Sequence, residues 1–243
     1  MRIAILSDVH GNRTALEAVL ADIRDQSPDL VLHGGDLADS GSSPIEVLDQ
    51  IRDLNLPGVC GNTDEMLIRP KALEDFAAQS KAPLALWDHI RAIAAATRVV
   101  LGQQRLDWLR TLPLAIEHPA IALVHARPGD CWRAPAADAT DADLKAVYAP
   151  LNQPIVVYGH THVPGIRRLS VPLPRLVINT GSVGLPYDGD PRASYLLLDN
   201  EIPTLRRVEY DLEKELRLLA MCGLPGAAWT AAMLRATAPT MPP

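Results

Sequence analysis

Seven polar residues of this chain have side chains that bind metal ions, and each stands at or just after the end of a short apolar run. They are Asp8, His10, Asp36, Asn62, His125, His160 and His162. In open α/β sheets the loops that follow the strands converge on one crevice over a rigid floor. The sequence therefore predicts that strand ends far apart in the chain direct these side chains to a common point.

The donor atoms in this set belong to carboxylate, imidazole and amide groups, without any thiolate. Such a set suits manganese, iron or zinc and differs from a structural zinc finger. Asp8 and His10 are two positions apart, as are His160 and His162. In extended backbone that spacing places both side chains on the same side, so each pair can reach one small site. Glycines that allow sharp turns stand beside the set at Gly11, Gly35, Gly61 and Gly159.

The elements expected to position these residues begin as a parallel α/β unit. Thr14 and Glu17 fit a capping box, and the helical spacing that follows predicts a helix that ends before Pro28. Ser43 as N-cap and Pro44 at the first helical position predict a second helix. Apolar runs predict three strands around these helices, at 3–6, 30–33 and 57–60.

The rest of the chain is expected to hold a helical insertion and then further strands. Residues 65–112 have helical spacing and few turn residues, which predicts two or three helices over the crevice. Short strands follow beyond residue 154. We expect one domain over residues 1–235, with C-terminal helices at about 211–235 and a frayed tail at 236–243.

Composition and charge exclude several classes of protein. A net charge of −6 and a pI near 5.6 argue against a nucleic-acid partner. Three cysteines at unrelated spacings argue against a disulfide framework and predict a reducing compartment. The apolar stretch before Ser7 is too short for a signal peptide, and no apolar window approaches the length of a membrane span. We therefore expect a cytoplasmic protein with no membrane partner.

Five short motifs together resemble one family, the calcineurin-like metallophosphoesterases. The motifs are D-V-H-G-N at 8–12, G-D at 35–36, G-N-T-D at 61–64, His125, and G-H-T-H at 159–162. They follow the family's order, and threonine at position 63, where many relatives have histidine, resembles the small bacterial phosphodiesterase branch more than the protein phosphatases. The resemblance implies an α/β fold, a four-layer sandwich of two mixed β-sheets flanked by helices, with a helical insertion.

The resemblance also implies a binuclear metal site and a hydrolytic reaction. One ion would be held by Asp8, His10, Asp36 and His162, and the other by Asp36, Asn62, His125 and His160, with Asp36 as the bridge. Manganese is the first expectation, with iron or zinc as alternatives, and metal-bound hydroxide would be the nucleophile. Two carboxylates against two divalent ions leave about two positive charges, which suits an anionic phosphoester of a small molecule. Asp36, Asn62 and His125 are the expected catalytic residues.

Two positions depart from the pattern of many relatives. Thr63 stands where they have a histidine that protonates the leaving oxygen or holds the phosphate, and threonine cannot act as a general acid near pH 7. The run after Asp36 also lacks the arginine that the protein phosphatases use to hold phosphate. The expected substrate-binding residues are therefore Asn12, Asn62, Thr63 and Arg127.

Several side chains near the motifs allow two interpretations. His33 either orients Asp36 or is a hydrogen-bonded structural histidine. Asp39 and Asp64 either orient neighbouring groups or form turns, and Asn12 can also cap the first helix. The turn N-T-G-S-V-G at 179–184 resembles a family segment that lines the crevice, or it only ends a strand. Three tryptophans either shape a substrate surface or pack in the core, and these are Trp87, Trp108 and Trp132.

Two alternative functions stay open at this stage. One is a non-catalytic scaffold for protein contacts on the same fold, and the other is a nuclease. Every predicted ligand position has a side chain that can bind a metal ion, which favours a catalytic function over a scaffold function. The acidic net charge argues against a nuclease, and homo-oligomerisation is left open.

Overall fold

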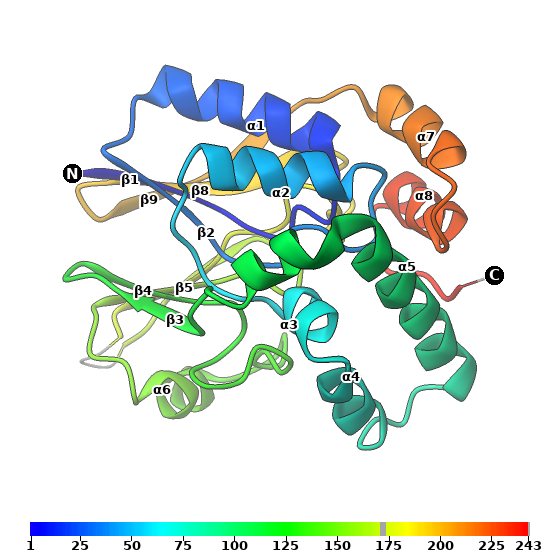
Figure 1. Ribbon diagram of the computed structural model, residues 1–243. Coiled ribbons are helices and arrows are strands. Elements are labelled where there is room, and N and C mark those ends of the chain that lie inside the picture. The colour runs from blue at the N-terminus through cyan, green and yellow to red at the C-terminus, as the bar shows by residue number, and fades with distance from the viewer. Residues whose placement is uncertain (171–173, 243) are drawn as a thin grey trace.

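The computed structural model describes residues 1–170 and 174–242, and within them nine strands form two mixed sheets (Figure 1). The first sheet has the order β2 (Leu30–His33), β1 (Arg2–Leu6), β8 (Ala193–Asp199) and β9 (Ile202–Val208). The second has the order β3 (Ala115–Glu117), β4 (Ile121–Val124), β5 (Ile155–Tyr158), β7 (Leu176–Asn179) and β6 (Gly165–Arg168). The pairs β1·β2, β4·β5 and β5·β7 are parallel, so their carboxyl ends meet at one edge of the sandwich.

Strand β1 shows why the two sheets stack. Successive side chains of a strand point to opposite faces, and in β1 both faces are buried. Ile3 and Ile5 pack in the cluster between the sheets, whereas Ala4 and Leu6 pack against the helices on the outer face. Each fully buried isoleucine or leucine contributes about 1.5–3 kcal/mol of transfer free energy. The buried strand predicted at residues 3–6 is confirmed.

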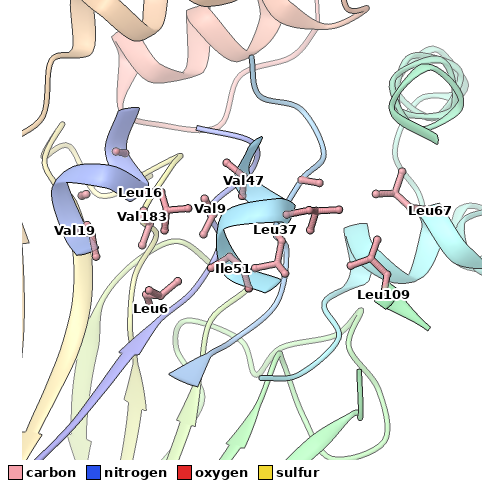
Figure 2. Packing of buried hydrophobic residues seen from close by; sticks show 14 of the residues in the cluster. Leu6, Val9, Leu16, Val19, Leu37, Val47, Ile51, Leu67, Leu109 and Val183 are labelled. Carbon is pink, nitrogen blue, oxygen red and sulfur yellow. The ribbon is translucent and has the colours of Figure 1, made fainter. Parts of the chain in front are cut away.

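Helices cover the outer face of each sheet and complete four layers (Figure 1). Helices α1 (Arg13–Gln26) and α2 (Pro44–Asp53) pack on the first sheet, and α6 (Asp141–Tyr148) packs on the second. Figure 2 shows Leu16 and Val19 of α1 and Val47 and Ile51 of α2 in the same cluster of buried side chains as Leu6 of β1. The expected sandwich of two mixed sheets flanked by helices is confirmed.

The start of α1 differs from its predicted start. Asn12 is the N-cap, and its side-chain oxygen accepts a hydrogen bond from the amide of Ala15 at 2.9 Å. The predicted capping box is wrong because the Thr14 hydroxyl instead donates to the buried Glu215 carboxylate at 2.8 Å. The predicted start of α2, with Ser43 as N-cap and Pro44 as first residue, is confirmed.

The third strand predicted near residue 60 is not formed. Gly58 makes a single bridge with His33 of β2, and the amide of Cys60 donates away from the sheet, to the carbonyl of Pro113. Pro57 has no amide to donate to a ladder, which limits pairing at this point. Three short elements that the sequence pattern did not reveal are β3, β6 and α6.

Five helices lie beyond the sandwich, at the side where the strands end (Figure 1). The insertion forms α3 (Asn62–Ile68), α4 (Pro70–Ala77) and α5 (Leu84–Leu109), and α5 is kinked at Gly102, whose φ is +69°. The C-terminal helices are α7 (Leu212–Met221) and α8 (Ala227–Ala236). In the tail that follows, the Thr240 carbonyl accepts a hydrogen bond from the indole of Trp229 at 2.9 Å. Residue 243 of that tail lies outside the described residues.

Across residues 1–170 and 174–242, no helix is long and apolar enough to cross a membrane.

Candidate metal centre

The seven predicted ligands come together at the carboxyl edge of the sandwich. Asp8 and His10 follow β1, Asp36 follows β2, His125 follows β4, and His160 and His162 follow β5. Asn62 reaches the same place differently, because it is the first residue of α3. Five of the seven are buried, whereas Asn62 and His160 are partly exposed and form the open side of the cluster.

One half of the cluster has the arrangement of a four-ligand metal site. Asp8, His10, Asp36 and His162 each offer one donor atom, and these atoms all lie within 4.8 Å of one another. The Nε2 atoms of His10 and His162 face each other at 3.1 Å, and His162 Nε2 lies 3.3 Å from Asp8 Oδ1. Two carboxylates and two imidazoles at this spacing can hold a divalent transition metal.

The other half of the cluster surrounds the amide oxygen of Asn62. That oxygen lies 2.9 Å from His125 Nε2 and 2.8 Å from His160 Nδ1. Asp36 connects the two halves, because its Oδ2 lies 3.6 Å from His10 Nε2 and 3.5 Å from His125 Nε2. Its other oxygen, Oδ1, accepts a hydrogen bond from the amide of Thr63 at 2.8 Å, which fixes the carboxylate plane.

Backbone carbonyls orient three of the imidazoles. The Nδ1 atoms of His10, His125 and His162 lie 3.1, 2.8 and 2.6 Å from the carbonyls of Asp39, Gly34 and Leu185. A carbonyl accepts only from an N–H, so Nδ1 carries a proton in each of these rings and Nε2 is the nitrogen that faces the cluster. The ring of Tyr187 also stacks on His162, with 4.4 Å between centroids.

Five of the seven ligand residues have a left-handed backbone conformation. Positive φ angles occur at Asp8 (56°), His10 (48°), Asp36 (54°), His160 (65°) and His162 (59°). Such angles are uncommon for residues with a side chain and cluster at functional sites. The expectation that two-residue spacing in extended backbone aligns each pair is therefore wrong, because tight turns align them.

Glycines let these loops approach one another. Gly35 has φ +89°, and a Cβ there would lie 2.4 Å from the amide nitrogen of Gly61. A Cβ on Gly61 would lie 2.1 Å from Asp36 Oδ1, and one on Gly159 would lie 2.3 Å from Asp8 Oδ2. A larger residue at any of the three would displace a ligand or its loop.

Two features that the sequence left ambiguous have structural roles around the cluster. Asp64 accepts hydrogen bonds from the amides of Asp36 at 2.8 Å, Gly61 at 3.0 Å and Leu37 at 3.0 Å, so it joins two ligand loops. The turn at 179–184 braces the loop after β1, since the Ser182 hydroxyl donates to the Asp8 carbonyl at 2.7 Å. The sequence signal for Asp64 was its place in the G-N-T-D motif.

Burial and neighbouring charges shift the pKa values of Asp36 and His125 in opposite directions. Burial raises the pKa of Asp36, but His125 and His10 lower it more, so the pKa of Asp36 lies well below its usual range. Burial lowers the pKa of His125, but Asp36 beside it raises that pKa to about 10. Burial also raises the pKa of Asp39 to about 7 and that of Asp64 to about 6. The cluster therefore keeps Asp36 ionised in a buried place, as a cation site requires.

His33 has neither of its expected roles. Its ring is fully buried near Trp108, and within the described chain its two ring nitrogens have no hydrogen-bond partner. Both interpretations required such a partner, so both are wrong. Burial lowers the pKa of His33 to about 3.

This burial predicts a specific loss of stability in acid. The folded pKa of His33 lies below its ordinary value of 6.5, so the stability carried by the neutral ring is complete above pH 6.5 and is lost as the pH falls toward 3. Between pH 7.5 and pH 5, the free energy of unfolding should fall in both proteins. We expect the fall to be about 2 kcal/mol smaller in His33→Leu than in the wild type. Urea unfolding of both proteins at the two pH values measures this, with the partly exposed His118→Gln as control. Equal losses in all three proteins would contradict it.

The four predicted substrate-binding residues separate into two groups. Asn62 and Thr63 line the cavity next to the cluster, and the buried Thr63 hydroxyl has no partner among the described residues. Asn12 is buried, and its amide group is engaged by Ala15 and by the carbonyl of Gly184 at 3.0 Å. Arg127 is paired with Asp130 at 2.6 Å and does not line this cavity. The structure thus brings Asn62 and Thr63 to the site but gives Asn12 a structural role and leaves Arg127 outside.

The cavity itself was not located by the sequence. It has a volume of about 270 Å³, and its polar lining residues are His10, Asp39, Ser40, Asn62, Thr63 and His160. The rest of the lining consists mainly of apolar side chains of the inserted helices and of α8. The cluster therefore opens into a pocket that the helical appendages enclose.

Comparison with known proteins agrees with this arrangement. A family model described as a calcineurin-like phosphoesterase superfamily domain matches residues 1–201. An uncharacterized protein of Methanocaldococcus jannaschii is 31% identical over an alignment of 243 positions, which covers 92% of this chain and 93% of that protein. A crystal structure of a metallophosphoesterase from Sphaerobacter thermophilus has a TM-score of 0.78 and 28% identity, and covers 98% of this chain and 100% of its own.

A third relative matches only part of this chain. The symmetrical bis(5'-nucleosyl)-tetraphosphatase of Methylococcus capsulatus is 32% identical over 152 residues, which are 61% of this chain and 51% of that enzyme. This chain thus spans about half of that relative, whereas it spans nearly all of the other two.

Proposed function

The chain belongs to the calcineurin-like phosphoesterase superfamily, and from this premise we propose that it is a phosphoester hydrolase that uses two divalent metal ions. The observation that carries the proposal is the position of Asp36 Oδ2, which lies almost equally far from His10 Nε2 and His125 Nε2. A carboxylate oxygen between two groups of donors is the arrangement that two neighbouring ions share.

The donor atoms fit such ions. Asp8, His10, Asp36 and His162 would hold one ion, and Asp36, Asn62, His125 and His160 would hold the other. When bound, two divalent ions neutralise phosphoryl oxygens and lower the pKa of water, so that water attacks phosphorus near neutral pH. Mixed oxygen and nitrogen ligands favour manganese, with iron or zinc as alternatives.

The protein groups near the open side would bind and orient the substrate. Asn62 and Thr63 lie where the cavity meets the cluster, and the free hydroxyl of Thr63 can donate to a phosphoryl oxygen or accept from water. The carbonyls that hold His10, His125 and His162 keep these rings fixed during turnover. The apolar walls of the cavity would exclude bulk water from the substrate.

Two alternative functions receive less support. A protein-interaction scaffold does not need buried ligands, yet all seven positions keep donor atoms and are packed together. A nuclease needs positive charge along its groove, and the chain has a net charge of −6. We also propose a cytoplasmic location, which the three unpaired cysteines support. The partner would be a small phosphorylated molecule.

One comparison of substrates tests the proposal. Hydrolysis of 4-nitrophenyl phosphate, bis(4-nitrophenyl) phosphate, a cyclic nucleotide and single-stranded DNA is measured with added manganese and after chelation. We expect at least one of the small esters to be hydrolysed with manganese, and this activity to disappear after chelation. Hydrolysis of DNA alone would favour a nuclease, and no hydrolysis with manganese, iron or zinc would favour a scaffold.

A further inference from the structure

Most of the side chains that line the cavity beside the metal cluster are apolar or aromatic. These come from α3, α4, α5 and α8 and from the loops after β4 and β7, elements that lie at the strand-end side of the sandwich (Figure 1). The aromatic members are Phe76, Trp87, Trp132, Tyr187 and Trp229. Such a wall binds a flat apolar group better than a sugar or a chain of phosphates.

The charges around this cavity are those of a site for a single phosphoryl group. Among the described residues that line it there is no lysine or arginine. Two guanidinium groups outside the lining, those of Arg127 and Arg133, are paired with Asp130, and that of Arg133 also lies 5.0 Å from the centroid of the Phe76 ring. A substrate with further phosphates would place negative charge against apolar walls without a partner, at a high desolvation cost. The wall therefore disfavours polyphosphate substrates.

Three aromatic rings pack on one another and form an aromatic wall of the cavity, and one of them has a free hydrogen-bond donor. In this aromatic wall the centroid of Phe76 lies 4.9 Å from that of Trp132 and 5.8 Å from that of Trp87. Trp87 is 7% exposed, and its indole N–H has no partner in the described part of the chain. By contrast, the indole N–H groups of Trp132 and Trp229 donate to Glu65 and to the Thr240 carbonyl. A buried donor left unpaired costs about 1–3 kcal/mol, so a ligand acceptor here would be stabilising.

We propose that the substrate is a phosphoester of an uncharged, flat, aromatic alcohol or phenol whose ring carries a hydrogen-bond acceptor. This rests on the proposed function, because the phosphoryl group is placed at the metal cluster and the ring against the aromatic wall. The cavity volume of about 270 Å³ is just below the ~300–1,000 Å³ of pockets for drug-sized ligands, which limits the group to one or two fused rings.

Binding of non-hydrolysable phosphonates tests the size and polarity of the group. Naphthylmethylphosphonate and methylphosphonate carry the same charged group and differ only in the aromatic ring. We expect the inhibition constant of the naphthyl compound to be about 30-fold lower, because its ring leaves water. Equal inhibition constants, or tighter inhibition by inorganic tripolyphosphate, would overturn the proposal.

Two variants with a matched control locate the binding site of the ring. Phe76→Ala is expected to reduce the preference for the naphthyl compound about tenfold. Trp108→Ala also removes a partly buried aromatic side chain, but Trp108 does not line the cavity, so the preference should persist. If both variants lose the preference for the naphthyl compound, or if neither does, the ring does not bind beside Phe76.

The free indole N–H has its own test. Among quinolinylmethylphosphonates with the ring nitrogen at different positions, one isomer should bind the wild type about tenfold more tightly than the naphthyl compound. Trp87→Phe should abolish that difference and keep the affinity for the naphthyl ring. If every isomer binds like the naphthyl compound, the acceptor is not part of the substrate.

Calorimetry of naphthylmethanol with the chelated protein separates failure of this proposal from failure of the proposed function. Saturable binding that Phe76→Ala weakens supports binding at the aromatic wall even if no ester is hydrolysed. Hydrolysis of small esters without any binding of naphthylmethanol or preference for aromatic rings would overturn this proposal but not the proposed hydrolase function.

Discussion

Replacing Asp36 by asparagine is expected to lower kcat/KM for the best small phosphoester by at least about 10³-fold, equivalent to about 4 kcal/mol of transition-state stabilisation. Asparagine keeps the shape of the side chain, and its amide oxygen can still accept from the Thr63 amide. It removes the negative charge that His10 and His125 face at 3.6 and 3.5 Å. Steady-state kinetics with manganese and the metal content of the purified variant measure the effect.

A second aspartate gives the matched control. Asp49 of α2 is partly buried and paired with Arg105 at 2.5 Å, but it lies outside the cluster. Asp49→Asn should therefore keep wild-type kcat/KM even if the free energy of unfolding falls. Wild-type turnover and metal content in Asp36→Asn would contradict the role of Asp36 as the shared ligand.

The identity of the ligands could be predicted from the sequence because it depends on local pattern. Asp8, Asp36, His125 and His160 each follow a buried apolar strand, and parallel strands bring their carboxyl ends to one edge. This rule needs only hydrophobic pattern and residue type. Asn62 is the exception: it was found by its motif, because the strand expected before it does not form.

The geometry that holds the ligands could not be predicted in the same way. Left-handed backbone at Asp8 or His162 is opposed by local preference and is maintained by contacts distant in sequence. Those contacts include the hydrogen bond from the Ser182 hydroxyl to the Asp8 carbonyl and that from His162 to the Leu185 carbonyl. Local sequence shows that the loops contain glycine but not which carbonyl fixes which ring.

The aromatic cavity depends even more on long-range packing. Trp87 and Trp108 belong to the same helix, α5, yet Trp87 lines the cavity and Trp108 does not. Which side of α5 faces the cluster is set by neighbours such as Gly226 before α8, where a Cβ would lie 2.3 Å from Ile93 Cδ1. A helical repeat gives the spacing along one helix, but not its rotation against a helix that begins more than a hundred residues later.

Removal of metal ions is expected to destabilise the protein strongly, and this follows from the same arrangement of donors. Without cations, the ring nitrogens of His10 and His162 face each other at 3.1 Å, and those of His125 and His160 at 3.2 Å, beside two buried carboxylates. Ions that bind only the folded chain stabilise it by about 4 kcal/mol at a free concentration of 1,000 times Kd.

Thermal unfolding with manganese and with excess chelator measures this stabilisation. Tm should rise with the logarithm of the manganese concentration, and metal analysis of the saturated protein should give two ions per chain. In Asp36→Asn the rise should be much smaller, whereas Asp49→Asn should respond like the wild type, because only the former loses the shared ligand. One ion per chain with an unchanged response of Asp36→Asn would mean that Asn62, His125 and His160 form no second site. A Tm independent of manganese, iron and zinc would mean that the buried cluster is stable without cations, and the proposed chemistry would then lack its basis.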